Sequence, residues 1–328
     1  VFENGTLAYV GAVNAITNRG MLFHMGGPRR EIEVTDADAT LSLTGTLTSF
    51  DGTGFVKTGA GTLSLSGVNT SLGSIEIAAG TLQVSSNSSL GAPSADVVLS
   101  GGKLQFASSM TSNRNLLLAD DGTVALLPGT AVVLGGVISG DGHLAVQSGN
   151  LDMLTLTGNA IHTGGTTVTN AWLAIGNGGT TGWIAGDVAT ASDGVLEFNR
   201  SDHVTFGGRI SGSGALQQSG AGTLELTGSN SYTGLTQVLG GTLLINGDQS
   251  AATGVAYVYP GATLGGSGII GGGVSVHNNA VLAPGSNGPG TLTIGGNLQL
   301  NADSVLDFEF GAANVADGGG PLNDLILV

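Results

Sequence analysis

Residues 220–247 read GAGTLELTGSNSYTGLTQVLGGTLLING and contain the phrase GTL twice, at Gly222 and again at Gly241 (241 − 222 = 19). Each phrase begins a run in which apolar residues are two positions apart, which is the period of a strand with one buried face. Glycine before such a strand allows the positive φ of a tight corner. The stretch therefore predicts two short strands, each entered from a glycine turn, and it predicts that Leu224 points into the core.

The same spacing recurs elsewhere in the chain. Equally spaced strand-like phrases begin at two other pairs of positions, Gly61 with Gly80 and Asp152 with Ala171 (80 − 61 = 19 and 171 − 152 = 19). No sustained 3.6-residue period accompanies them. Short strands that recur in this way are typical of a solenoid, in which each turn of the chain stacks on the last. The repeats predict an all-β fold, a parallel β-helix with roughly twenty residues per rung, where a rung is one turn of the solenoid.

Composition excludes several classes of partner. Among 328 residues there are 60 glycines, and eight Lys and Arg stand against 23 Asp and Glu, giving a net charge of −15. A nucleic-acid partner needs a basic stripe, so we expect none, and an anionic membrane surface is disfavoured for the same reason. The longest apolar stretch, from Val124, is interrupted by Pro and Gly, so we expect no direct membrane insertion of this chain. There is no cysteine, which excludes disulfides and thiol catalysis.

Three phrases resemble the passenger-associated repeats of bacterial autotransporters. They are KTGAGTLSLSG at Lys57, SGAGTLELTGSNSYTG at Ser219 and VLAPGSNGPGTLTIGG at Val281. The resemblance implies a right-handed β-helix that is displayed on the bacterial surface or secreted, after export through the periplasm and the outer membrane. It also implies a partner within the precursor, a C-terminal translocator β-barrel. We therefore expect this chain to be a passenger fragment.

Residues 1–40 fit the repeat poorly, whereas residues 41–328 follow it. We expect the first segment to form irregular N-terminal rungs or a contact segment, and the second to form a single continuous solenoid. The phrase MLFHMGGPRREIEV, at residues 21–34, is rich in Met and basic residues. It is either a contact loop or an irregular rung. If it is a contact loop, Arg29 and Arg30 are the expected partner-binding residues, because an acidic chain offers few other cationic anchors.

The remaining polar residues give no sign of catalysis. His162 follows its phrase start by the same interval as Tyr232 does, so we expect a corner residue rather than a ligand (162 − 152 = 10 and 232 − 222 = 10). The other histidines have no second histidine or carboxylate at metal-ligand spacing. No G-x-S-x-G phrase marks a nucleophile. Carboxylate pairs in the turns are better explained as solvated loop residues. We expect no catalytic residue, no metal and no cofactor.

The leading functional hypothesis is a non-catalytic scaffold of an adhesin or virulence factor that binds a host protein or glycan. The alternative is the β-helical stalk of an autotransporter enzyme, either a protease or a polysaccharide-cleaving enzyme, whose catalytic part lies upstream. Irregular stretches between rungs are the expected places of recognition, because insertions in a solenoid project from one side. These stretches are residues 21–34, 110–121 and 180–202.

Overall fold

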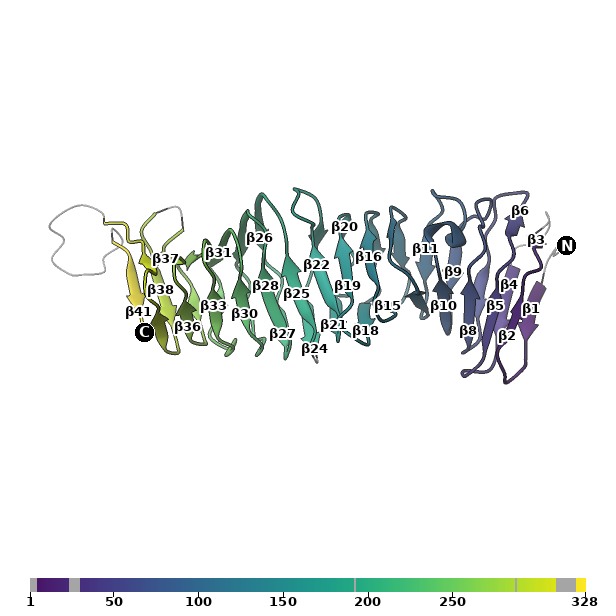
Figure 1. Cartoon of the computed structure of the whole chain (residues 1–328), viewed down its shortest axis with the longest axis horizontal. Helices are drawn as coiled ribbons and strands as arrows, with labels where there is room; N and C mark the ends of the chain where they lie inside the picture. The colour runs from purple at the N-terminus through teal and green to yellow at the C-terminus, as the bar shows by residue number, and fades with distance from the viewer. Residues whose placement is uncertain (1–4, 24–29, 192, 287, 311–322) are drawn as a thin grey trace. The chain divides into compact units, whose positions relative to one another are not determined.

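The structure is a computed structural model that describes residues 5–23, 30–191, 193–286, 288–310 and 323–328. These residues form short β-strands joined by turns, with one 3₁₀ turn at Asn87–Leu90 and no α-helix within the described ranges (Figure 1). No helix in this part of the chain is long and apolar enough to cross a membrane. The described residues group into two compact units, residues 5–167 with 183–185 and residues 168–182 with 186–328. The predicted division at residue 40 stays a prediction.

The first unit is built from strands that pair in parallel with strands of the preceding and following turns. One sheet has the order β1 (Gly5–Tyr9), β4 (Arg30–Val34), β7 (Val56–Thr58), β9 (Ile75–Ile77), β11 (Val97–Leu99), β14 (Leu116–Leu118), β17 (Ile138–Gly140), β20 (Asn159–Ala160) and β23 (Trp183–Ile184). A second has the order β2 (Ala15–Thr17), β5 (Thr40–Leu43), β8 (Thr62–Leu65), β10 (Thr81–Val84), β12 (Lys103–Phe106), β15 (Gly122–Leu126) and β18 (Leu144–Ser148). Shorter sets are β3 (Met21–Phe23) with β6 (Leu47–Ser49), and β13 (Met110–Ser112), β16 (Ala131–Leu134) and β19 (Met153–Leu156). Strand β21 (Thr166–Thr169) contains the point where the second unit begins.

The second unit repeats the arrangement with four sets of strands. The longest set is β22 (Trp172–Ile175), β25 (Val195–Phe198), β28 (Ala215–Gln218), β30 (Thr236–Val238), β33 (Ala256–Val258), β36 (Val274–Val276) and β39 (Leu298–Leu300). A second set is β26 (His203–Phe206), β29 (Thr223–Leu226), β31 (Thr242–Ile245), β34 (Thr263–Gly266), β37 (Val281–Pro284) and β40 (Val305–Leu306). The others are β24 (Val188–Ala191) with β27 (Ile210–Gly212), and β32 (Asp248–Gln249), β35 (Ile269–Ile270), β38 (Thr291–Ile294) and β41 (Leu325–Leu327).

Parallel pairing between successive turns confirms the predicted β-solenoid. Thr62 of β8 pairs with Thr81 of β10 (81 − 62 = 19), and Thr81 pairs with Lys103 of β12 (103 − 81 = 22). A turn takes roughly 22 residues, close to the roughly twenty expected. Because each turn lies on the previous one, the backbone groups of interior strands are paired on both sides.

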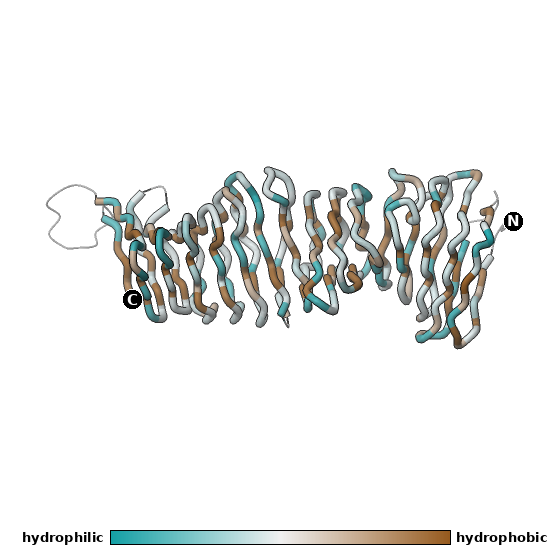
Figure 2. Tube along the Cα trace, viewed as in Figure 1, coloured by the Kyte–Doolittle hydropathy of each residue, from teal (hydrophilic) through white to brown (hydrophobic). Residues whose placement is uncertain are grey.

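Alternate residues of each strand fill the core. Leu224 is 1% exposed and is aligned with Val204 of β26 and Leu243 of β31, as predicted. The in-register ladder continues to Leu264 and Leu282, both fully buried. Hydrophobic segments accordingly recur turn after turn along the Cα trace (Figure 2). Burying each of these Leu side chains contributes about 1.5–3 kcal/mol.

The GTL phrase marks a corner where successive turns are in close backbone contact. Gly241 has a φ of +55°, and a Cβ placed there would lie 2.2 Å from the carbonyl oxygen of Gly222 in the preceding turn. Gly80 also has a positive φ, and its Cβ would lie 2.4 Å from the carbonyl oxygen of Gly59. A side chain at either corner would force the stacked turns apart. The glycine is therefore required by stacking as well as by turn geometry.

Candidate binding surface

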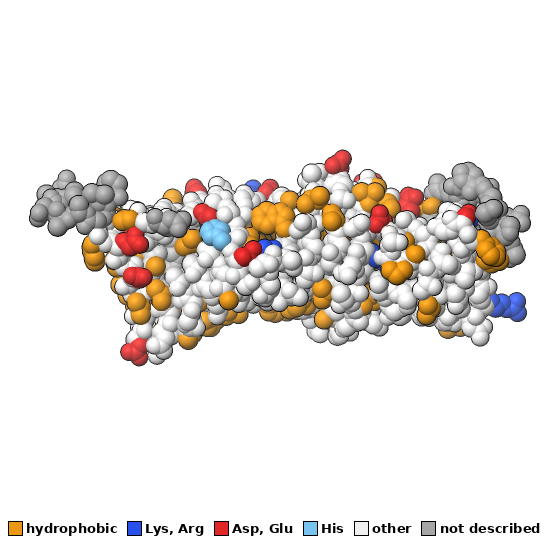
Figure 3. All heavy atoms as spheres, turned by 90° about the horizontal axis from the view of Figure 1, so that it is seen from above, with side chains coloured by type: hydrophobic (Ala, Val, Ile, Leu, Met, Phe, Trp, Pro, Cys, Tyr) orange, Lys and Arg blue, Asp and Glu red, His pale blue; other side chains and the backbone are white. Residues whose placement is uncertain are grey.

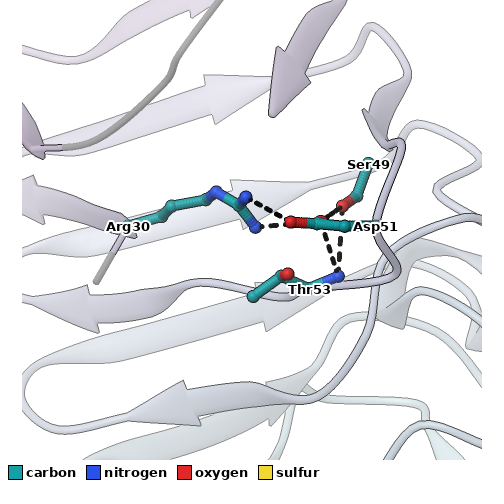
Figure 4. A network of polar contacts seen from close by, with 4 residues as sticks. All are labelled: Arg30, Ser49, Asp51 and Thr53. Carbon is teal, nitrogen blue, oxygen red and sulfur yellow. Dashed lines mark hydrogen bonds and ion pairs between the residues drawn. The ribbon is translucent and has the colours of Figure 1, made fainter. Parts of the chain in front are cut away.

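The predicted contact residue Arg30 begins β4 and is only 3% exposed. Its Nη2 lies 2.8 Å from Asp51 Oδ2 and its Nη1 lies 3.3 Å from Oδ1. The Ser49 hydroxyl and the Thr53 backbone N–H also donate to Asp51, at 2.7 and 3.1 Å (Figure 4). The Arg30 hydrogen bond and then those of Ser49 and Thr53 hold the pKa of Asp51 well below its usual range. This network orders the loop after β6. Arg29 lies outside the described residues.

Other basic side chains also serve the scaffold. Lys57 is fully buried, and its Nζ donates to the carbonyl oxygens of Thr58, Gly59 and Ala79 at 2.7, 2.9 and 3.1 Å. Burial lowers the pKa of Lys57 to about 8. These bonds satisfy carbonyls at a corner that the solenoid leaves without strand partners.

Arg114 caps a second corner. Its guanidinium is buried and donates to the Asn87 side chain and to the carbonyl oxygens of four residues, Asn87, Gly91, Ala92 and Ala95. Burial lowers the pKa of Arg114. Arg200 makes a similar contact, pairing with Asp202 at 2.6 Å and donating to the Gly182 carbonyl. The chain has only eight Lys and Arg, and these side chains are sparse on the face shown in Figure 3.

His162 and Tyr232 are both corner residues, as their alignment predicted. His162 is fully buried, and its Nε2 lies 2.9 Å from the Thr166 hydroxyl. Tyr232 is 2% exposed, and its hydroxyl lies 2.6 Å from that of Thr236. Burial lowers the pKa of His162 and raises that of Tyr232 to about 12. Both side chains thus stay neutral in the interior at neutral pH.

Buried carboxylates make local structural contacts. Asp152 is 7% exposed and accepts hydrogen bonds from the backbone N–H groups of Gly129 and Thr130 and from the Ser148 hydroxyl. Glu197 is 5% exposed and accepts from Gln217 and Ser219. Within the described residues, no three His, Asp or Glu side chains are placed to hold a metal ion.

Two stretches expected to project as insertions are ordinary parts of the solenoid. Residues 110–121 contain β13 and β14, which pair in register with β16 and β17. Residues 180–202 contain β23, β24 and β25. This expectation was wrong because these residues depart from the usual phrases but keep the strand spacing. In the third stretch, residues 21–34, the structure describes β3 and β4, and residues 24–29 lie outside the described ranges.

The outer face of the β22–β39 sheet has the most distinctive surface chemistry. In-register residues on this face form two adjoining rows. The first comprises Glu197, Gln217, Gln237, Tyr257, Ser275 and Gln299, of which Glu197, Gln217 and Ser275 are covered by their neighbours to 5–7% exposure. Beside it, the rings of Tyr259 and His277 stack with centroids 5.0 Å apart and planes inclined by 10°. The Tyr257 ring is tilted against His277 at 6.0 Å, and Gln237 Nε2 donates to the Tyr259 hydroxyl at 3.3 Å.

A groove of about 320 Å³ lies along β36 on this face. Val255 and Tyr257 form one wall, Asn297 and Gln299 form the other, and β36 with the preceding Gly273 forms the floor. Among the described residues that line it, none is charged. Sequence reasoning missed this site. The available signal was the pair Tyr257 and Tyr259 on one outward face, followed one turn later by His277.

The repeat itself matches a known family. The model of the passenger-associated-transport-repeat matches residues 55–84, 152–175 and 216–245. These stretches run from β7 to β10, from β19 to β22 and from β28 to β31. Each contains a pair of the strand phrases identified from the sequence.

Three curated proteins share parts of the sequence. The adhesin BmaC autotransporter of Brucella suis biovar 1 (strain 1330) is 48% identical over 136 residues, which are 40% of this chain and 4% of that protein. An extracellular serine protease of Serratia marcescens is 46% identical over 85 residues, 26% of this chain and 8% of the protease. The Neisserial autotransporter lipoprotein NalP of Neisseria meningitidis serogroup B (strain ATCC BAA-335 / MC58) is 31% identical over 164 residues, 44% of this chain and 14% of the lipoprotein. The matches thus span at most 14% of these relatives. No solved structure matches the chain.

Proposed function

We propose that this chain, which is a passenger segment of a bacterial autotransporter, acts as a non-catalytic scaffold that presents a binding surface to a host protein or glycan. Such passengers are surface-exposed or secreted. The proposal includes a precursor whose C-terminal translocator carries the segment to the cell surface. The name of the Brucella relative, an adhesin, supports binding as the role.

The observation that carries the proposal is that several reactive side chains are buried and hydrogen-bonded within the chain itself. Catalysis needs an acid, base or nucleophile that faces a substrate with its reactive atoms available. Here Lys57, Arg114 and His162 are buried and hydrogen-bonded within corners, and Asp152 and Glu197 accept bonds from their own neighbours. The outer face of β30, β33, β36 and β39 instead presents neutral polar and aromatic side chains in register. That arrangement suits recognition.

Binding is tested with the purified 328-residue chain on cultured host epithelial cells. We expect saturable binding of the fluorescently labelled chain, and competition by an excess of unlabelled chain. Heat-unfolded chain at the same concentration is the control for non-specific adsorption. Binding that rises linearly with concentration and resists competition would contradict the proposal.

Arg29 and Arg30 remain a proposed contact for an anionic partner. The Arg30–Asp51 pair makes Arg29 the informative position, because replacing Arg30 also breaks an ion pair whose Arg side chain is buried. An Arg29→Ser variant is therefore expected to reduce cell binding, and its denaturation midpoint is measured alongside as the control for folding. An unchanged binding curve for this variant would remove the segment from the binding surface.

The second candidate is a stalk that carries an enzyme. It is favoured by the match to the Serratia protein, whose name is that of a serine protease. Under this hypothesis the secreted product of the whole precursor hydrolyses casein, and deletion of residues 41–328 abolishes its secretion or folding. A secreted product that adheres to cells and leaves casein intact would favour the binding role.

A further inference from the structure

The groove along β36 is formed by the register of three successive turns. Val255 and Tyr257 lie one turn before β36, since Tyr257 is aligned with Ser275. Asn297 and Gln299 lie one turn after β36, since Ser275 is aligned with Gln299. The hollow arises because the small residues Gly273 and Ser275 lie between the larger side chains of the two neighbouring turns. A Cβ at Gly273 would approach the Asn297 carbonyl oxygen to 2.9 Å, so this part of the floor has no room for a side chain without a shift in the backbone.

The lining combines an aromatic ring with uncharged polar groups. Tyr257 offers a ring and a hydroxyl, Ser275 a hydroxyl, and Asn297 and Gln299 each offer both donors and acceptors. Small-molecule sites typically combine aromatic walls with a few polar groups in volumes of about 300–1,000 Å³, so this groove fits a small ligand. Because the described lining is uncharged, it offers no ionic partner to an anion or a cation.

The aromatic wall is held in place before any ligand arrives. Tyr257 packs against His277, His277 stacks on Tyr259, and Tyr259 accepts a hydrogen bond from Gln237 in the preceding turn. A wall fixed by neighbours loses little conformational entropy on binding. This order favours a stable ligand site over an incidental surface depression.

We propose that the groove along β36 binds a neutral saccharide. A sugar ring has an apolar C–H face that can lie against Tyr257 and hydroxyls that can exchange hydrogen bonds with Ser275, Asn297 and Gln299. A peptide strand would instead need unpaired backbone groups at a sheet edge, whereas β36 is paired on both sides, by β33 and β39. The assignment rests on the proposed binding function and specifies its ligand class and place.

The test is isothermal titration of the 328-residue chain with neutral oligosaccharides: lactose, maltotriose, cellotriose, chitotriose and mannotriose. Sialyllactose and a heparin tetrasaccharide are the anionic comparison. We expect at least one neutral sugar to bind with a Kd that changes less than twofold between low and moderate NaCl concentration. Absence of binding by all five neutral sugars, or binding of the anionic sugars alone, would overturn the assignment.

Two variants locate the site. Tyr257→Ala removes the aromatic wall, and Ser275→Leu fills the floor from an outward position, so each is expected to raise the Kd at least tenfold. Thr293→Ala, on the separate β38 strand, is the matched control and should leave the Kd unchanged. If Ser275→Leu fails to fold, Tyr257→Ala carries the test. A Kd unchanged in a folded groove variant would place the sugar elsewhere and refute the proposal.

Comparison with cell binding separates this inference from the function on which it rests. Saturable cell binding without any binding of the five neutral sugars would refute the saccharide groove and leave the adhesive role standing. Sugar binding that Ser275→Leu abolishes, in a chain that does not bind cells, would support the groove and contradict the adhesive role. Failure of both assays would contradict both.

Discussion

The Tyr232 hydroxyl lies 2.6 Å from the Thr236 hydroxyl inside the solenoid, and His162 meets Thr166 across the same four-residue interval. Tyr232 follows His162 by 70 residues, and Thr236 follows Thr166 by the same number (232 − 162 = 70 and 236 − 166 = 70). The two pairs therefore occupy equivalent corners of two repeat copies. At both corners, the buried polar group of an aromatic side chain is thus within hydrogen-bond distance of the hydroxyl of a threonine four residues later. At each corner the buried polar group thus has a hydrogen-bond partner.

Removing one partner of the Tyr232–Thr236 pair should destabilise the fold more than removing both. Thr236→Val leaves the buried Tyr232 hydroxyl without this partner and should lower the free energy of unfolding by about 1–3 kcal/mol. Adding Tyr232→Phe should recover part of that loss. Chemical denaturation of the two single variants and the double variant measures the coupling. Strictly additive losses would show that the hydrogen bond contributes nothing.

Replacing His162 by tyrosine should preserve the corner and change its response to pH. Burial lowers the pKa of His162 below 6.5, so the unfolded chain takes up a proton more readily than the folded chain. The stability that His162 contributes is therefore complete above pH 6.5 and is lost as the pH falls through that value toward the folded pKa. Denaturation midpoints measured on both sides of that pH should fall less steeply on acidification for His162→Tyr than for the wild type. Identical pH profiles for the two proteins would contradict the prediction that His162 contributes to the pH dependence of stability.

The inward and outward positions of one strand should respond differently to the same new side chain. Leu224 is 1% exposed, whereas Glu225 lies on the outer face, where it accepts hydrogen bonds from Asn246 and Thr205. Leu→Ala substitutions in a core cost about 2–5 kcal/mol, and Leu224→Asp also buries a charge, so it should cost more. Glu225→Asp should cost less than about 1 kcal/mol. Equal denaturation midpoints would contradict the inward position of Leu224.

Arg114 should matter far more to stability than a less buried cation nearby. Arg114→Met removes donors from several carbonyl oxygens of the turn at residues 87–95 and should cost more than about 3 kcal/mol, since each buried acceptor left unpaired costs about 1–3 kcal/mol. Lys103→Met, at a half-buried position of β12, is the control and should cost under about 1 kcal/mol. Thermal denaturation of the two variants provides the comparison. A similar loss in both would argue against the capping role of Arg114.

The sequence was sufficient to predict features that repeat and insufficient for those that depend on turn length. The inward position of Leu224 follows from alternation within one strand, and the corner role of His162 follows from alignment with Tyr232. The groove is different, because it depends on which outward residues become neighbours. The turn from Tyr257 to Ser275 is short (275 − 257 = 18), whereas the turn from Ser275 to Gln299 is long (299 − 275 = 24). A uniform period could not align these side chains.

Buried basic residues were unpredictable for a related reason. Lys57 and Arg114 donate to carbonyl oxygens of corners, and no local pattern marks a carbonyl that lacks a strand partner. Arg30 lies within the irregular phrase at residues 21–34, which suggested a contact with another molecule. Its partner within the chain, Asp51, is 21 residues away and comes beside it only when two turns are stacked. The internal ion pair of Arg30 could therefore not be read from the local sequence.

The central claim is that this segment binds its ligand and leaves it unchanged. The direct measurement is mass spectrometry of glycans and glycopeptides from host epithelial surfaces, captured on the immobilised chain, eluted and compared with the material applied. The account predicts that the captured species are enriched and intact, and that Tyr257→Ala reduces their capture. Shortened glycans or peptides that accumulate with time, and that disappear when a single carboxylate or serine is replaced, would contradict it.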